Sequence, residues 1–129
     1  MLAVEDGDFE GAFCDPPYEG HAFLVVSYQR VLERHGGDPL SGRRLHRRFF
    51  EAGIPDPELT VVQHVHRSGP AKLLPHSTVE ATADAIVREG VATADQVQAA
   101  LDSFADYAAD PRTIVGSPRN FPVWTRRES

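Results

Sequence analysis

Strand and helix signals alternate along the 129 residues of this chain, and that alternation restricts the fold more than any other feature of the sequence. Apolar and β-branched runs predict strands at 1–5, 58–66, 112–116 and 121–127. Two helical segments separate the first strand from the second, and two more precede the last two strands. This order predicts an α/β domain in which helices pack on a sheet. Pro122 predicts that the final strand lies at an edge or carries a bulge.

Apolar residues at helical spacing predict four helices, at 21–35, 39–52, 77–89 and 93–109. Asp38 is the expected N-cap of the second helix, because it precedes a proline at the first helical position. The patterns Ser77-x-x-Glu80 and Thr93-x-x-Gln96 predict capping boxes at the starts of the third and fourth helices.

Composition and charge limit the classes of partner. With 19 acidic and 13 basic residues the net charge is −6, so we expect neither a nucleic acid nor an anionic membrane as partner. The acidic N-terminus and the lack of a long apolar run predict no signal peptide and no membrane span. Cys14 is the single cysteine, which fits a reducing cytoplasm. No repeat or linker interrupts the chain, so we expect residues 1–129 to form one domain.

Two segments of the sequence carry a resemblance to a known family: MLAVEDGDF at 1–9 and YQRVLERHGGDPLSGRRLHRRFFEAGIPDPELTVV at 28–62. They resemble the C-terminal half of class I S-adenosylmethionine-dependent methyltransferases. The likeness is to the small-molecule branch that includes the ubiquinone and menaquinone methylases. The family pattern GxxLxxxxxxAG is matched by residues 42–53. TIVGSPRNFPVWTRR, at 113–127, looks like the closing strand of that fold.

The resemblance implies a partial Rossmann-like sheet of about three strands, the last two antiparallel, with four helices. It implies a methyltransferase whose substrate is a small molecule and whose cofactor is S-adenosylmethionine. The glycine-rich cofactor loop and the acidic residue that holds the ribose are absent from this sequence. We therefore expect the chain to be the substrate-pocket half of the enzyme. As an isolated chain it is expected neither to bind the cofactor tightly nor to catalyse methyl transfer.

The first predicted strand would lie inside the sheet of such an enzyme, so in this chain it exposes an apolar edge. Two partners would cover that edge: a separately encoded N-terminal half, or a second copy in a homodimer. The alternative function is accordingly a non-catalytic binding or dimerisation module.

Ligands of open α/β sheets bind at the carboxyl ends of the strands, and an acidic turn follows the first strand here. Asp6 and Asp8 are therefore the candidate polar residues of a substrate-binding wall. Phe9, Phe13 and Tyr18 are its candidate apolar residues, which suit an aromatic or otherwise bulky acceptor. Solvated turn carboxylates that bond their own backbone are the competing interpretation for Asp6 and Asp8.

The run Asp15-Pro16-Pro17-Tyr18 resembles the active-site loop of methyltransferases that act on amino groups. That chemistry requires the loop at the end of the fourth strand of the sheet, beside the cofactor. Here the loop follows the acidic turn of the strand that resembles the fifth. It is therefore expected to contribute to a pocket wall and not to hold an amino group.

Two further clusters allow a functional and a structural interpretation. His64 and His66 would lie on one face of a strand, the spacing of a metal pair, but no third ligand follows from the sequence, and no metal is expected. The run RRLHRR at 43–48 would present a phosphate-binding face, or arginines that extend outward near Glu33 and Glu51. The helical spacing of the apolar residues between the arginines favours the second interpretation.

Overall fold

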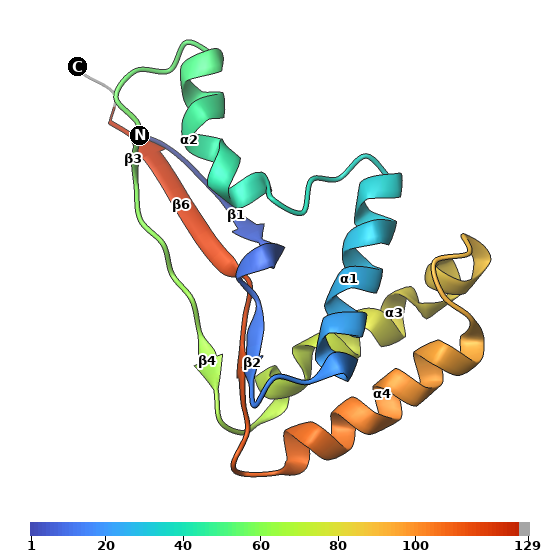
Figure 1. Ribbon diagram of the computed structural model, residues 1–129. Coiled ribbons are helices and arrows are strands. Elements are labelled where there is room, and N and C mark those ends of the chain that lie inside the picture. Colours follow the sequence, from blue (N-terminus) through green and yellow to red (C-terminus); the bar gives the residue numbers. More distant parts are fainter. Residues whose placement is uncertain (127–129) are drawn as a thin grey trace.

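The computed structural model describes residues 1–126 of the chain (Figure 1). Its strands are β1 (Leu2–Asp8), β2 (Phe13–Asp15), β3 (Glu58–Leu59), β4 (Val65–His66), β5 (Ile114–Gly116) and β6 (Arg119–Thr125). Its helices are α1 (Glu19–Arg34), α2 (Ser41–Glu51), α3 (Leu74–Arg88) and α4 (Ala94–Ala109), with short 3₁₀ turns at Phe9–Gly11 and Pro70–Leu73. The predicted α/β fold with four helices is confirmed. Residue 127 of the predicted last strand lies outside the described residues.

The strands form two three-stranded sheets, β1–β6–β3 and β2–β5–β4, in which every pairing is antiparallel. Figure 1 shows that they follow one another as one long ribbon, with β5 and β6 in its centre. β6 is antiparallel to both β1 and β3, so β1 and β3 run in the same direction. The resemblance implied a three-stranded sheet whose last two strands are antiparallel. In the β1–β6–β3 sheet these strands are β3 and β6, and they are antiparallel.

The strand predicted at 58–66 follows its central partner from end to end, but only its ends are regular. Glu58 faces Trp124 and Val62 forms an isolated bridge with Asn120, whereas Val65 faces Gly116. Between these two pairs, residues 63–64 therefore oppose residues 117–119, which places one extra residue in the central strand. This bulge breaks the predicted nine-residue strand into β3 and β4.

Pro122 lies in β6, the central strand of its sheet, so the prediction of an edge strand is wrong. Its carbonyl accepts a hydrogen bond from the N–H of Thr60, and a proline has no N–H to return. The ladder between the two strands weakens at this pair, and β3 ends at Leu59. The bulge that the sequence also allowed lies between β5 and β6, a few residues before the proline.

Two predicted helix starts are wrong. α2 begins at Ser41, and the carboxylate of Asp38 accepts a hydrogen bond from the Leu40 N–H at 2.9 Å instead of capping the helix. α3 begins at Leu74, because the 3₁₀ turn before it continues directly into the helix, so Ser77 is an internal residue. The predicted capping box of α4 is confirmed, with both hydrogen bonds between Thr93 and Gln96 present.

The apolar residues form two separate cores. The larger lies among α1, α3, α4 and β5 and includes Leu24 and Phe104, both fully buried. The smaller lies under α2, which covers one face of the β1–β6–β3 sheet (Figure 1), and contains Leu45, Phe49 and Val123. Each fully buried side chain of this size stabilises the fold by roughly 1.5–3 kcal/mol.

Candidate functional site

An apolar pocket of about 60 Å³ lies where β1 ends and the chain turns into its first 3₁₀ turn. Its walls come from α1, the start of α3 and the junction between β5 and β6. Apolar side chains dominate it, among them Phe9, Tyr28, Leu74 and Val115, and His66 of β4 borders it. A pocket at the carboxyl end of a strand is the expected ligand position in an α/β fold.

Phe9 is the predicted wall residue that lines this pocket. Its backbone N–H donates to the Pro39 carbonyl at 2.9 Å, which fixes the turn after β1 against the segment that leads into α2. The rings of Phe9 and Tyr28 are tilted by 48° with their centroids 5.2 Å apart. This aromatic pair forms one side of the pocket.

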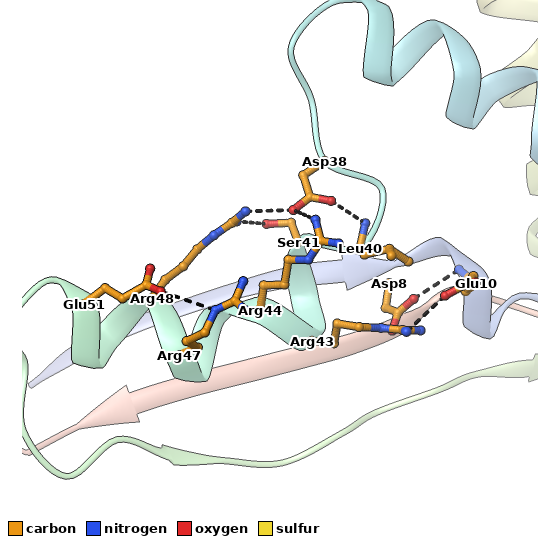
Figure 2. Close-up of polar contacts among 10 residues, drawn as sticks. All are labelled: Asp8, Glu10, Asp38, Leu40, Ser41, Arg43, Arg44, Arg47, Arg48 and Glu51. Carbon is orange, nitrogen blue, oxygen red and sulfur yellow. Dashed lines mark hydrogen bonds and ion pairs between the residues drawn. The ribbon is translucent and has the colours of Figure 1, made fainter.

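Asp8 does not line the pocket, and its side chain contacts Arg43 of α2 (Figure 2). Its side chain is 1% exposed and accepts a hydrogen bond from Arg43 Nε at 2.6 Å, and Arg43 Nη1 lies 3.0 Å from Glu10. The other carboxylate oxygen of Asp8 accepts from the Glu10 N–H and caps the 3₁₀ turn. Asp6 is exposed and its side chain accepts from the Gly7 N–H. Both carboxylates lie within β1, which extends three residues beyond its predicted end.

Phe13 and Tyr18 are held by other contacts. The Phe13 ring covers Gly116 so closely that a Cβ there would lie 2.1 Å from it. Tyr18 stacks on Tyr107 of α4 with the ring centroids 4.7 Å apart. The Tyr107 hydroxyl donates to the Pro16 carbonyl at 2.6 Å, and burial, reinforced by Cys14, raises the pKa of this phenol. The Asp-Pro-Pro-Tyr loop is therefore fastened to α4.

His64 and His66 lie with their ring centroids 6.3 Å apart, and His66 alone of the two lines the pocket. Within residues 1–126 no group of three or more histidine, cysteine or acidic side chains comes close enough to hold a metal ion. Of the two histidines, His66 is thus the one that borders the pocket.

The arginines of α2 are paired with carboxylates (Figure 2). Asp38 accepts from Arg44 at 2.8 Å and from Arg48 at 2.7 Å. Desolvation opposes ionisation of Asp38, but these hydrogen bonds and that from Leu40 outweigh it and lower its pKa. Arg47 lies 3.4 Å from Glu51, as predicted, whereas the partner expected at Glu33 is replaced by Asp38. These pairs favour the structural interpretation of the cluster over a phosphate-binding face.

The sequence did not indicate two residues that shape the pocket region, Gln63 and Tyr28. Gln63 Nε2 donates to the carbonyls of Gly11 and Ser117, both at 2.7 Å, and so ties the turn after β1 to the bulge beside the pocket. Tyr28 had only the helical spacing of a core residue. The one signal for Gln63 in the sequence is its polar side chain inside a predicted strand. That signal does not identify the Gly11 and Ser117 carbonyls as its partners.

No model of a known protein family matches this chain, and no curated protein matches it. None of the helices within residues 1–126 is long and apolar enough to cross a membrane.

Proposed function

We propose that this chain is the acceptor-binding, C-terminal portion of an S-adenosylmethionine-dependent methyltransferase that acts on a small molecule in the cytoplasm. The observation that carries the proposal is the succession of β1, α2, β3 and β6. It provides the three strands that the resemblance implies, with the last antiparallel to the one before it. The apolar pocket lies at the carboxyl end of the first of these strands.

The packing of α2 on the sheet supports the family pattern at 42–53. A Cβ on Gly42 would lie 2.7 Å from the Asp6 carbonyl oxygen and 2.9 Å from the Phe121 ring. The first glycine of the pattern therefore allows the helix to approach β1 closely. Leu45 contributes to the small core under the helix, and Gly53 has a φ of +78° just after the helix ends. Each of these positions has a physical requirement that its residue meets.

The residues of this chain do not fit a cofactor site for S-adenosylmethionine. Four glycines within residues 1–126 have positive φ, and they lie beside helices or 3₁₀ turns: Gly36, Gly53, Gly69 and Gly90. None of them opens a loop directly after a strand, where a cofactor loop lets its backbone approach the ligand. The contribution that we assign to this chain is to bind and orient the methyl acceptor.

The outer edge of β1 is the surface on which the cofactor-binding half would pair. β1 bonds to β6 on one side, and no other strand of the described residues bonds to it. Leu2 and Val4 are 45% and 40% exposed. The first three residues of β1 are apolar, and an open strand edge is a template for another strand.

Isothermal titration tests the division of function between the two halves. We expect no tight binding of S-adenosylmethionine to the isolated chain. The product of the longest reading frame that contains this chain is expected to bind the cofactor and to transfer a labelled methyl group to a small molecule. Tight binding by the isolated chain, or a longer product that does not bind, would contradict the proposal.

The same edge favours the second candidate function, a dimerisation module. Light scattering after size-exclusion chromatography separates the two, because a module would form a dimer that Val4→Lys dissociates. Val61→Lys is the matched control, since Val61 is 47% exposed and precedes Val62, which bridges to β6 on the side opposite to β1. A stable monomer at high concentration would count against the dimerisation module.

A further inference from the structure

A second pocket lies between the segment that follows β4 and the C-terminal part of α4. Its volume is about 320 Å³, within the range of roughly 300–1,000 Å³ of pockets that hold small molecules. It shares no lining residue with the first pocket: Ala71 and Leu74 line that one, whereas Lys72 and Leu73 line this one. The two pockets are therefore separate sites, each bordered by the 3₁₀ turn at Pro70–Leu73.

Lys72 places a positive charge at the walls of the second pocket. It is 2% exposed, and its Nζ donates to the Arg67 carbonyl at 3.0 Å and to the Asp110 carbonyl at 3.2 Å. Arg67 lines the pocket on one side, and Asp110 lies between the lining residues Ala109 and Pro111 on the other. The ammonium group is therefore fixed between the two segments that form the pocket walls.

No carboxylate of the described residues forms an ion pair with the Lys72 ammonium group. The Asp110 carboxylate is bound by Arg112, whose Nε and Nη2 lie 3.0 Å and 2.7 Å from its two oxygens. Hydrogen bonds from Arg112, with a weaker contribution from the charge of Lys72, lower the pKa of this carboxyl to about 2. Asp110 and Arg112 neutralise each other, so the buried charge of Lys72 lacks a counter-ion, which an anionic ligand would supply.

The other lining residues indicate the rest of the ligand. Arg67 is exposed, and within residues 1–126 its guanidinium has no ion-pair partner. A guanidinium binds a carboxylate through two parallel hydrogen bonds. No acidic side chain of the described residues lines the pocket, and its α4 wall consists of Ala105, Ala108 and Ala109. These short apolar side chains leave room for a hydrocarbon chain.

We propose that the second pocket binds a small aliphatic carboxylate. Its carboxylate pairs with Arg67 near the Lys72 ammonium group, and its hydrocarbon chain packs on the alanines of α4. The inference is independent of the proposed function, because this pocket shares no lining residue with the one assigned to the methyl acceptor. Binding is measured on the isolated chain, without cofactor or turnover.

Nuclear magnetic resonance titration of the isotope-labelled chain tests the inference, with hexanoate, 1-hexanol and inorganic phosphate as the probes. Hexanoate is expected to shift the amide signals of Ser68, Gly69 and Ala109. 1-Hexanol is expected to bind at least tenfold more weakly, because it lacks the charge-assisted hydrogen bonds. Phosphate is expected to bind more weakly than hexanoate, because it has no apolar part to bury. Absence of hexanoate-induced shifts at these residues overturns the inference, and so does binding of 1-hexanol or phosphate as tight as that of hexanoate.

A pair of arginine variants tests the carboxylate contact. Arg67→Gln is expected to weaken hexanoate binding about tenfold and to leave 1-hexanol binding unchanged. Arg30→Gln is the matched control, because Arg30 is exposed, does not line the pocket, and its replacement changes the net charge of the chain equally. Equal hexanoate affinities of the two variants would show that the carboxylate does not pair with Arg67, and this would overturn the inference.

Two further variants test the apolar wall and the buried charge. Ala109→Phe is expected to abolish the hexanoate-induced shifts, and Ala99→Phe, which changes an exposed alanine of α4 outside the pocket, is expected to retain them. Lys72→Met is expected to weaken hexanoate binding at least tenfold. Because it also removes two hydrogen bonds of the fold, the Ala109→Phe result decides if the Lys72→Met chain does not fold. Unchanged hexanoate binding by Ala109→Phe, or by folded Lys72→Met, overturns the assignment of the site.

Discussion

Replacement of Arg43 by methionine tests whether Asp8 has a structural role. Arg43 Nε donates to the Asp8 carboxylate at 2.6 Å, and the Asp8 side chain is 1% exposed (Figure 2). Methionine keeps an unbranched apolar side chain on α2 but removes the charge. Asp8 would then remain as a buried carboxylate whose only other polar partner among the described residues is the Glu10 N–H.

The exposure of the Arg43 and Asp8 side chains sets the expected loss of stability in Arg43→Met. Loss of one partner from a fully buried ion pair costs about 3–5 kcal/mol, whereas an exposed pair contributes at most about 1 kcal/mol. Arg43 is 41% exposed, so solvent screens the pair from one side, and we expect a loss of about 2 kcal/mol. With a urea m-value of about 2 kcal/mol/M, the unfolding midpoint should fall by about 1 M.

Trp124 is the single tryptophan of the chain and lies in β6, so its fluorescence reports urea unfolding. Arg47→Met is the matched control on the same helix, because its pair with Glu51 is 3.4 Å long and both side chains are more than 60% exposed. The control should lose less than about 0.5 kcal/mol. If Arg43→Met and Arg47→Met have the same midpoint, Asp8 does not depend on its pair and the reasoning is refuted.

Three further substitutions have definite expected outcomes in the same urea assay. Gly42→Ala should destabilise the chain. Overpacking against the Asp6 carbonyl costs about 1–3 kcal/mol, which exceeds the gain of roughly 1 kcal/mol in helix propensity. A urea midpoint equal to or higher than that of the parent chain would contradict the close approach of α2 to β1. Lys72→Met should lower the free energy of unfolding by about 1–3 kcal/mol. Lys72 is 2% exposed and donates to two backbone carbonyls, which would lose their partner. An unchanged urea midpoint would show that these two hydrogen bonds contribute little. His21 is 5% exposed and burial lowers its pKa, so the folded state favours the neutral ring. Its contribution is complete above about pH 6.5, the unfolded value, and is lost as the pH falls toward the folded pKa. His21→Phe should therefore lose less stability than the parent chain between pH 7.5 and 5.5, and equal losses would exclude His21 as the cause.

The sequence patterns that predicted the fold correctly were those that depend only on residues close together in the sequence. Alternating strand and helix patterns identified four helices, and Thr93 with Gln96 located the start of α4, because a capping box needs only residues close in sequence. Asp38 is not the cap because its carboxylate bonds the Leu40 N–H in the turn before the helix, which begins only at Ser41. Ser77 failed because the turn before α3 already provides a helical start. The turns that precede α2 and α3 therefore decided where these two helices begin.

The candidate site was predictable in position but not in composition. The carboxyl end of the first strand was the expected place for a pocket, and Phe9 lies there. Asp8 has the same local pattern but meets an arginine 35 residues away, a contact that no spacing rule provides. Tyr28 reaches the pocket region from α1, and Gln63 and His66 reach it from the β3–β4 segment, so these residues meet from parts of the chain far apart in the sequence.

The bulge in the central strand lies between the two apolar cores. Val115, on one side of it, belongs to the core of α1, α3 and α4, and Val123, on the other side, belongs to the core under α2. The pocket is lined by Gly116, Ser117 and Pro118, so it lies at the joint between the two. A molecule that fills the pocket would contact the strand residues at this joint and would resist twisting of the β1–β6–β3 sheet relative to the β2–β5–β4 sheet.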